Sequence, residues 1–360
     1  MLGLFQTSAD RPSTMHVVVR PPLTFESARL RPPPIRGGTL YHLELIASDG
    51  TTGSAPVRVF DDTRPILKRL CVALLGQPVF AAAERWARHT SRAGPHACGP
   101  TWTALSAIEN AAADLSARAL GVPLYELLGG CARRRLTVAA SIVAERREID
   151  RVTSRVGRLL TLGVQAVVVR SPHAQWRPAH QLLAALRDTF GWDLRLRLAL
   201  ERPLSRDEQH ACMASMKSLA LEYIEDRAID AYTNDSPRCT RAAVREWDSI
   251  ADTLRSPAYA VVNLSVMGWG GVPGIERIGA ACRVLRREVV LSCDTTMGAD
   301  LPLSTHVALA LPAATMGVTI PLGLDDTTIT WLCQSTLATT ETMNTQNGHG
   351  TVSATEALDA

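Results

Sequence analysis

Side chains that could carry out acid–base or anion-binding chemistry follow several apolar runs in the second half of this sequence. Arg170 and His173 come after VQAVVV, Glu225 ends LEYIE, and Asp294 comes after EVVLSC. A carboxylate or an imidazole in partly apolar surroundings can transfer protons near neutral pH. A guanidinium binds a carboxylate through two parallel hydrogen bonds. These residue types therefore predict proton transfer on a small molecule that carries an anionic group.

Each of these charged residues also has a structural explanation. Arg170 is either an anion clamp or the partner of Glu225 or Glu201 in a salt bridge across the mouth of the fold. Glu225 can in turn pair with Arg197 or Arg227. A histidine in a loop is commonly an ordinary surface residue. The sequence leaves both explanations open for each group.

The apolar runs alternate with helical patterns from about residue 136 onward. Continuous apolar strands separated by helices indicate a parallel sheet. Seven or eight such units over about 200 residues favour a closed (β/α) barrel, whose active site lies at the carboxyl ends of the strands. One further, weakly marked strand is expected near 228–232. The clear runs cover 136–143, 164–169, 194–200, 221–225, 259–266, 288–293 and 316–320.

The first 130 residues have a different pattern of apolar and polar residues. Residues 1–60 alternate in short apolar runs around turn residues, which predicts an antiparallel hairpin or meander. A helix is expected after Asp62, and a second helix over 102–120, where apolar residues recur at helical spacing. The residues expected on the buried face of the first helix are Ile66, Leu70, Val72 and Leu75.

Composition excludes several classes of function. The chain has 360 residues and a formal net charge of +3, without a basic patch of the kind that binds nucleic acid. No apolar run approaches the roughly 18 residues of a membrane span, and no secretory signal is visible at the N-terminus. The eight cysteines are scattered without a C-x-x-C motif, which favours free thiols in the cytoplasm. Only Lys68 and Lys217 are lysines, so few lysines could serve as a base.

The block AIENAAADLSARALGVPLYELLGG (107–130) resembles the helix and turn that precede the barrel in the enolase superfamily, in its mandelate racemase and muconate lactonizing branch. The similarity continues in LGVQAVVVR, LEYIED, VVNLSVMGWGGVPGIERIGAACR and MGADLPLSTHVALALP. It implies a modified (β/α)7β TIM-like barrel over 133–335 with an N-terminal α+β capping domain over 1–132. The polar tail over 336–360 is then either disordered or returns to the capping domain. Glu109 and Asp114 are expected to be structural.

The same resemblance implies proton removal next to a carboxylate by a lysine or histidine base, with magnesium stabilising the enediolate. This sequence departs from that pattern. The slot for two lysines on the second strand reads Val168-Val169-Arg170, and the slot for two metal ligands on the third reads Leu198-Ala199-Leu200. Ser265 stands in the lysine slot of the sixth strand, and Thr296 in an acidic slot near the seventh.

Only the fourth-strand metal ligand is retained, as Glu225, and Asp235 is the best candidate for the fifth strand. Magnesium requires several oxygen ligands in near-octahedral geometry. Glu225 and Asp235 are therefore weak metal candidates, and we expect no cofactor.

Three functions are compatible with these residues. The first is a metal-independent lyase, isomerase or cyclase acting on an apolar or carboxylate-bearing molecule, such as a secondary metabolite. The second is a catalytically silent barrel kept for ligand binding or oligomer assembly, and the third is a conventional magnesium-dependent racemase, cycloisomerase or dehydratase. We expect a cytoplasmic homo-oligomer with a small-molecule substrate and no nucleic-acid or membrane partner. The expected catalytic residues are Arg170, His173, Glu225 and Asp294, and the expected substrate-binding residues are Ser141, Leu198, Leu200, Asn263, Ser265, Trp269 and Thr296.

Overall fold

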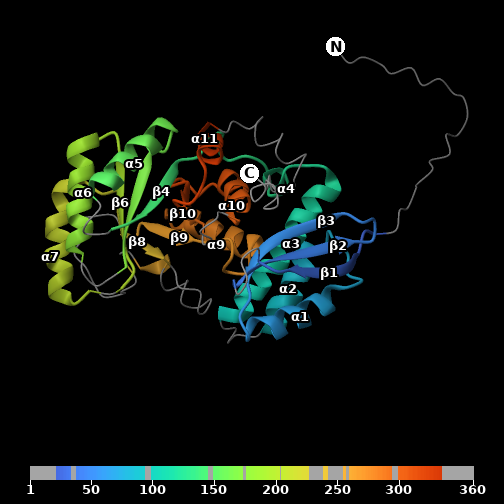
Figure 1. Ribbon diagram of the computed structural model, residues 1–360. Helices are drawn as coiled ribbons and strands as arrows, with labels where there is room; N and C mark the ends of the chain where they lie inside the picture. The colour runs from blue at the N-terminus through green and yellow to red at the C-terminus, as the bar shows by residue number, and fades with distance from the viewer. Residues whose placement is uncertain are drawn as a thin grey trace, which may run out of the picture.

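A computed structural model of the chain shows a three-stranded sheet with helices followed by a barrel (Figure 1). It describes residues 22–33, 38–93, 99–144, 149–172, 176–202, 204–226, 238–241, 254–256, 259–293 and 299–334. Within these ranges, no helix combines the length and hydropathy of a membrane span.

The N-terminal part is an antiparallel sheet covered by the long helix α3. The strands lie in the order β1-β2-β3, and a side chain at Gly53 of β3 would come within 2.3 Å of the backbone of α3. Glycine is therefore required for this close approach of strand and helix. The predicted meander and the helix over 102–120 are confirmed. The elements are β1 Phe25–Arg31, β2 Leu40–Ala47, β3 Thr52–Arg58, α1 Thr63–Leu74, α2 Ala82–Ala93, α3 Gly99–Leu120 and α4 Leu124–Leu127.

Helix α1 follows Asp62 as predicted, and Leu70 and Ile66 contact the core as expected, but the placement of Val72 and Leu75 on the buried face was wrong. Leu67, Leu70 and Leu74 are buried, whereas Val72 is 63% exposed and Leu75 is 43% exposed. The spacing of the three leucines is that of one helical stripe. Val72 and Leu75 fall outside this stripe, so their apolar character wrongly indicated that they are buried.

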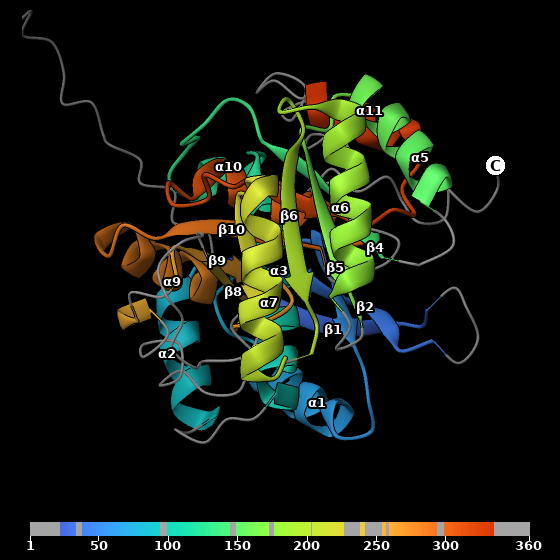
Figure 2. The same cartoon turned by 90° about the vertical axis from the view of Figure 1, so that its left-hand side faces the viewer.

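The second half is a closed barrel of eight parallel strands in the order β10-β11-β4-β5-β6-β7-β8-β9. Figure 2 shows the helices α6 and α7 beside the strands β5 and β6 of this barrel. The predicted modified barrel with an α+β capping domain is confirmed. The strands are β4 Val138–Val143, β5 Ala166–Ser171, β6 Arg195–Leu200, β7 Tyr223–Asp226, β8 Arg238–Arg241, β9 Val261–Leu264, β10 Glu288–Ser292 and β11 Val318–Ile320. The barrel helices are α5 Ile149–Thr161, α6 Arg177–Phe190, α7 Arg206–Met216, α9 Val272–Val284, α10 Leu301–Ala310 and α11 Asp326–Gln334.

The fifth barrel strand lies outside the segment where we expected it. Strand β8 covers Arg238–Arg241 and pairs with β7 and β9, whereas the expected position, 228–232, lies outside the described residues. The strand reads RCTR, so no apolar run marks it. The C-terminal tail, 336–360, also lies outside the described residues.

Strand register fixes which side chains share a row on the inner face of the barrel. Arg170 of β5 pairs with Ala199 of β6, which pairs with Glu225 of β7. One layer toward the amino end, Arg197 is paired in the same way with Tyr223. Paired residues of parallel strands point to the same face, so the inner face carries Arg170, Ala199 and Glu225 in one layer and Arg197 and Tyr223 in the next.

Candidate active site

The row made by Arg170, Ala199 and Glu225 lies at the carboxyl ends of three adjacent strands, where barrel enzymes carry their catalytic groups. Arg170 is partly exposed and Glu225 is buried. Ala199 separates them with only a methyl group. A cation and a carboxylate are thereby placed about two strand spacings apart, or roughly 10 Å between backbones.

Leu198 and Leu200, predicted to line the pocket, lie on the other face of β6. They pack in an apolar cluster with side chains of α6 and α7, such as Leu183 and Met216. The inner face of β6 instead carries Ala199, and Glu201 follows it at the next inward position. The expectation that Leu198 and Leu200 line the pocket is therefore wrong by one residue of register.

Arg170 pairs with Glu201, which is one of the two salt bridges left open by the sequence. Its Nε donates to Oε1 of Glu201 at 2.7 Å, and Nη2 lies 2.5 Å from the same oxygen. The two side chains are 29% and 35% exposed. One edge of the guanidinium is thus occupied by an internal carboxylate rather than by a ligand.

Glu225 takes part in a buried hydrogen-bonded chain that runs along the inner wall of the barrel from β7 to β9 and β10. Nδ2 of Asn263 donates to Oε2 of Glu225 at 2.9 Å, and Oγ of Ser292 donates to Oδ1 of Asn263. All three residues are buried. Asn263 was predicted to touch substrate, but here it holds the carboxylate. Ser292 was missed, although its place at the end of the apolar run of β10, two residues after Val290, marks it as inward-facing.

The arginines proposed as partners of Glu225 are placed differently. Arg197 is fully buried and its Nε donates to Oε2 of Glu222 at 2.6 Å, at the amino end of the barrel. It also lies 5.2 Å from the ring centre of Tyr223. Arg227 lies outside the described residues. Among the described residues, the donor to the Glu225 carboxylate is therefore an amide and not a cation.

The remaining predicted residues divide into three groups. Ser141 is half-buried on the inner face of β4, in register with Val168. Ser265 accepts a hydrogen bond from the backbone of Met267 at 3.2 Å and so stabilises the turn after β9. The structure does not describe His173, Asp235, Asp294 and Thr296.

Trp269 lies in the loop after β9 and is 1% exposed, within the apolar core of the barrel. Its φ of 58° is in the left-handed region that side chains seldom adopt. The indole therefore serves packing in this structure and does not present a face for stacking on a ligand.

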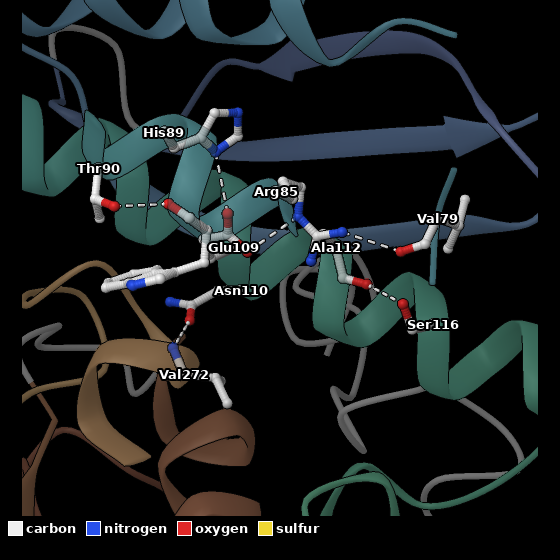
Figure 3. Close-up of polar contacts among 10 residues, drawn as sticks. Val79, Arg85, His89, Thr90, Glu109, Asn110, Ala112, Ser116 and Val272 are labelled. Carbon is white, nitrogen blue, oxygen red and sulfur yellow. Dashed lines mark hydrogen bonds and ion pairs between the residues drawn. The ribbon is translucent and has the colours of Figure 1, made fainter. Parts of the chain in front are cut away.

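The loop that contains Trp269 is fixed from the N-terminal part of the chain (Figure 3). Asn110 of α3 donates from Nδ2 to the carbonyl of Val266 at 2.7 Å, and its Oδ1 accepts from the amide of Val272 at 2.9 Å. A side chain at Gly271 would come within 2.4 Å of that Oδ1. Asn110 therefore fixes the position of both ends of the loop that follows β9, the strand that carries Asn263.

Beside Asn110, Glu109 is completely buried between two basic side chains (Figure 3). Nε of Arg85 donates to Oε2 at 3.0 Å, and Nδ1 of His89 lies 3.0 Å from Oε1. Asp114 is also buried, and its Oδ2 accepts from the amide of Ser54 at 2.8 Å. These contacts join α3 to α2 and to the sheet, and neither carboxylate faces the barrel mouth row.

Sequence models of two protein families match the two halves of the chain. The N-terminal domain of mandelate racemase / muconate lactonizing enzyme matches residues 40–129, and the enolase C-terminal domain-like family matches residues 139–355. The second match covers more than half of the chain. The chain belongs to the enolase superfamily, in its mandelate racemase / muconate lactonizing branch.

Characterised relatives in this branch carry out different reactions. The chain is 27% identical over 223 residues to a hydrophobic dipeptide epimerase of Roseobacter litoralis, covering 57% of this chain and 61% of the relative. It is 27% identical over 290 residues to a D-galactonate dehydratase family member of Chromohalobacter salexigens, covering 67% and 71%. A chloromuconate cycloisomerase of Cupriavidus pinatubonensis is 27% identical over 221 residues, covering 58% of each chain. The chain thus spans about three fifths of the epimerase and the cycloisomerase.

Solved structures share the fold at low sequence identity. An isomerase from Streptomyces coelicolor superposes with a TM-score of 0.72 at 19% identity, over 82% of this chain and 87% of that one. An enolase from Pseudomonas fluorescens, solved with bound magnesium, potassium and tartrate, gives 0.69 at 18% identity, over 84% and 82%. These similarities establish the fold alone.

Magnesium is the metal that this superfamily commonly binds, and it requires several oxygen ligands in near-octahedral geometry. Among the described residues, no group of three or more His, Cys, Asp or Glu side chains is placed to hold a metal. Glu201 is engaged by Arg170, Glu225 by Asn263, and the residue between Arg170 and Glu225 in the row is Ala199. The described residues therefore do not supply the oxygen ligands that magnesium requires.

Proposed function

We propose that the protein is a lyase or isomerase that moves a proton next to the carboxylate of a small molecule, without a metal. Glu225 is the acid–base group, and Arg170 is the cation that binds the substrate anion. The observation that carries this proposal is the row Arg170–Ala199–Glu225, which puts a buried carboxylate and a partly exposed guanidinium on the same inner face. Its substrate class is a carboxylate with an acidic carbon–hydrogen bond.

The chemistry follows from the charges involved. Removing a proton from the carbon next to a carboxylate leaves an enediolate, and a fixed cation nearby stabilises its additional negative charge. A guanidinium stays protonated at every working pH, so Arg170 supplies that charge without taking part in proton transfer. Asn263 donates a hydrogen bond to Oε2 of Glu225. Oε1 is therefore the atom that accepts the substrate proton, which it then returns to the carbon or donates to a leaving group.

The related epimerase, dehydratase and cycloisomerase support proton transfer as the shared step. They do not identify the product, because the fate of the enediolate depends on the substrate. Return of the proton to the opposite face gives an epimer, whereas loss of a leaving group gives an elimination product. The assay for this activity therefore uses several different carboxylates as substrates.

A second candidate, a catalytically silent barrel, is favoured by the Arg170–Glu201 salt bridge. The ion pair already neutralises the guanidinium, as expected of a mouth that is filled by its own side chains. The two candidates differ in whether a carboxylate can replace Glu201 on Arg170.

Proton exchange in D2O distinguishes these possibilities. The protein is incubated with hydrophobic dipeptides and aldonates, and loss of the α-proton signal is followed by NMR, with EDTA or with added magnesium. We expect exchange that persists in EDTA and is lost in Glu225→Gln. The control is Glu84→Gln, which removes a carboxylate that is 68% exposed on α2, and it should exchange normally.

Three results would change the conclusion. Exchange only with magnesium would show that ligands outside the described residues complete a metal site. Normal exchange in Glu225→Gln would remove that residue from the mechanism. No exchange with any acid, together with carboxylate binding that Arg170→Ala leaves intact, would favour the silent barrel.

A further inference from the structure

One side of the barrel mouth carries an exposed apolar side chain next to Arg170. Strand residues alternate between the two faces of a sheet, and Ile142 of β4 packs with side chains of α5 and α6 on the outside, so Val143 lies on the inner face. Val143 is in register with Arg170 of β5, and the amide of Ala144 donates to the carbonyl of Arg170 at 2.8 Å. Figure 2 shows β4 and β5 side by side. The end of β4 is thereby fixed beside the residue that carries the cation of the site.

Val143 continues an apolar surface of the barrel interior. It is 43% exposed, although it is apolar and faces inward. Val168 of β5 and Ala199 of β6 belong to a small buried cluster inside the barrel, separate from the clusters that pack against the helices. We call Val143, Val168 and Ala199 the apolar wall. Its exposed part is the side chain of Val143.

The opposite side of the mouth is polar. Glu225 and Asn263 belong to the hydrogen-bonded chain along β7, β9 and β10, and the guanidinium of Arg170 is turned toward Glu201, which follows β6. A ligand held between Arg170 and Glu225 therefore has polar groups on one flank and the apolar wall on the other. Sites in which a few polar groups fix the orientation and apolar side chains line the remainder are typical of small-molecule binding.

We propose that the substrate is a carboxylate with an apolar substituent, and that Val143 is the residue that selects this substituent. The inference rests on the proposed function, because it takes Arg170 as the group that binds the carboxylate. Contact with the substituent removes the exposed surface of Val143 from water, which favours binding by up to about fourfold for each buried CH2 group. A hydroxyl in the same place loses its hydrogen bonds to water and finds no partner on the apolar wall. Sugar acids should therefore bind less tightly than alkyl carboxylates of the same length.

Alkyl carboxylates of different lengths test this selection. Propionate, hexanoate and gluconate are each competed against succinate in isothermal titration of the full chain, and hexanoate and gluconate share the same chain length and charge. We expect hexanoate to bind at least about tenfold more tightly than propionate, since complete burial of its additional CH2 groups would give about sixtyfold. Gluconate should bind at least about tenfold more weakly than hexanoate. Val143→Asn should lower hexanoate affinity at least about fivefold and leave propionate affinity unchanged.

Matched variants separate selection by Val143 from a general loss of binding. Val143→Leu keeps an apolar side chain and should retain the preference for hexanoate. Val72→Asn replaces another valine, which is 63% exposed on α1, and should change neither affinity. Arg170→Ala should abolish the binding of all three acids, because they occupy the mouth through their carboxylates. Thermal unfolding establishes that each variant is folded.

The outcomes distinguish this selection from the proposed catalysis. Equal wild-type affinity for propionate and hexanoate, or a preference that Val143→Asn leaves intact, would overturn the selection even where α-proton exchange depends on Glu225. A preference that depends on Val143 without any α-proton exchange would retain the apolar subsite and refute the catalysis. Hexanoate binding that persists in Arg170→Ala would show that the acid binds elsewhere, and it would also overturn the selection. Failure of every acid to bind would overturn both the selection and the role of Arg170.

Discussion

Replacing Glu201 by glutamine isolates the role of the Arg170 guanidinium. The substitution removes the charge that holds Nε and Nη2 of Arg170 but keeps an oxygen of similar shape. If Arg170 is the anion-binding group of the active site, its freed edge should bind an added carboxylate more tightly. If the pair only stabilises the fold, the change should appear in stability alone.

The structure sets the size of both effects. The two side chains are 29% and 35% exposed, so solvent screening limits the pair to about 0.2–1 kcal/mol of unfolding free energy. A charge-assisted hydrogen bond contributes about 1.5–3 kcal/mol, and about 1.4 kcal/mol corresponds to a tenfold change in affinity. Glu201→Gln should therefore bind succinate up to about fivefold more tightly than the wild type, because release of Arg170 from the pair returns at most about 1 kcal/mol, and the stability cost should stay below about 1 kcal/mol.

Isothermal titration with succinate at low salt and urea unfolding of the same samples measure the two quantities. Asp326→Asn serves as the control, because it removes an exposed carboxylate that pairs with Arg158 far from the mouth. Arg170→Ala should abolish binding with nearly unchanged stability. Arg170→Lys should lose almost as much affinity for succinate, because lysine keeps the positive charge but cannot form the two parallel hydrogen bonds of a guanidinium. Equal succinate affinity in the wild type, Glu201→Gln and Arg170→Ala would refute the assignment of Arg170.

Further predictions concern the supporting residues. Ser292→Ala should lower the rate of α-proton exchange severalfold and leave carboxylate affinity unchanged, since Ser292 acts on Glu225 only through Asn263; a change in affinity alone would contradict this. Burial raises the pKa of Asp114 from its usual 3.8 to about 7, so the folded chain holds this proton more tightly than the unfolded chain. The free energy of unfolding should then fall by roughly 4 kcal/mol as pH rises from about 4 to about 7. Asp114→Asn should remove that slope in urea unfolding, and an unchanged slope would exclude Asp114 as its source. Gly271→Ala should lower the melting temperature more than Gly50→Ala does, because both have positive φ but only Gly271 lacks space for a side chain; equal effects would exclude the contact with α3.

Seven of the eight barrel strands could be predicted because each is a buried apolar run between helical segments. Strand β8 could not, since a four-residue strand with two arginines carries no such signal. Two of the four residues expected on the buried face of α1 were misjudged, because Val72 and Leu75 are apolar but exposed. Hydrophobicity alone does not distinguish a buried side chain from an exposed one.

The candidate site was less predictable, for two physical reasons. In β6 the leucines alternate with arginine and alanine, and this period of two was the signal that Leu198 and Leu200 face the helices. The contact between Glu225 and Asn263 had no local signal, because β8 lies between β7 and β9 and the curvature of the sheet there brings the two side chains together. Pairings of this kind depend on tertiary structure and are absent from any sequence window.

The bonds from Asn110 to Val266 and Val272 have a consequence for chimeric proteins. A hybrid that joins the first 132 residues of a relative to this barrel would need an asparagine at the same place on its long helix. Without it, a buried carbonyl and a buried amide in the loop after β9 would each lose a partner, at a cost of about 1–3 kcal/mol apiece. Recombination at this boundary is thus restricted by one side chain that lies more than twenty residues before the junction.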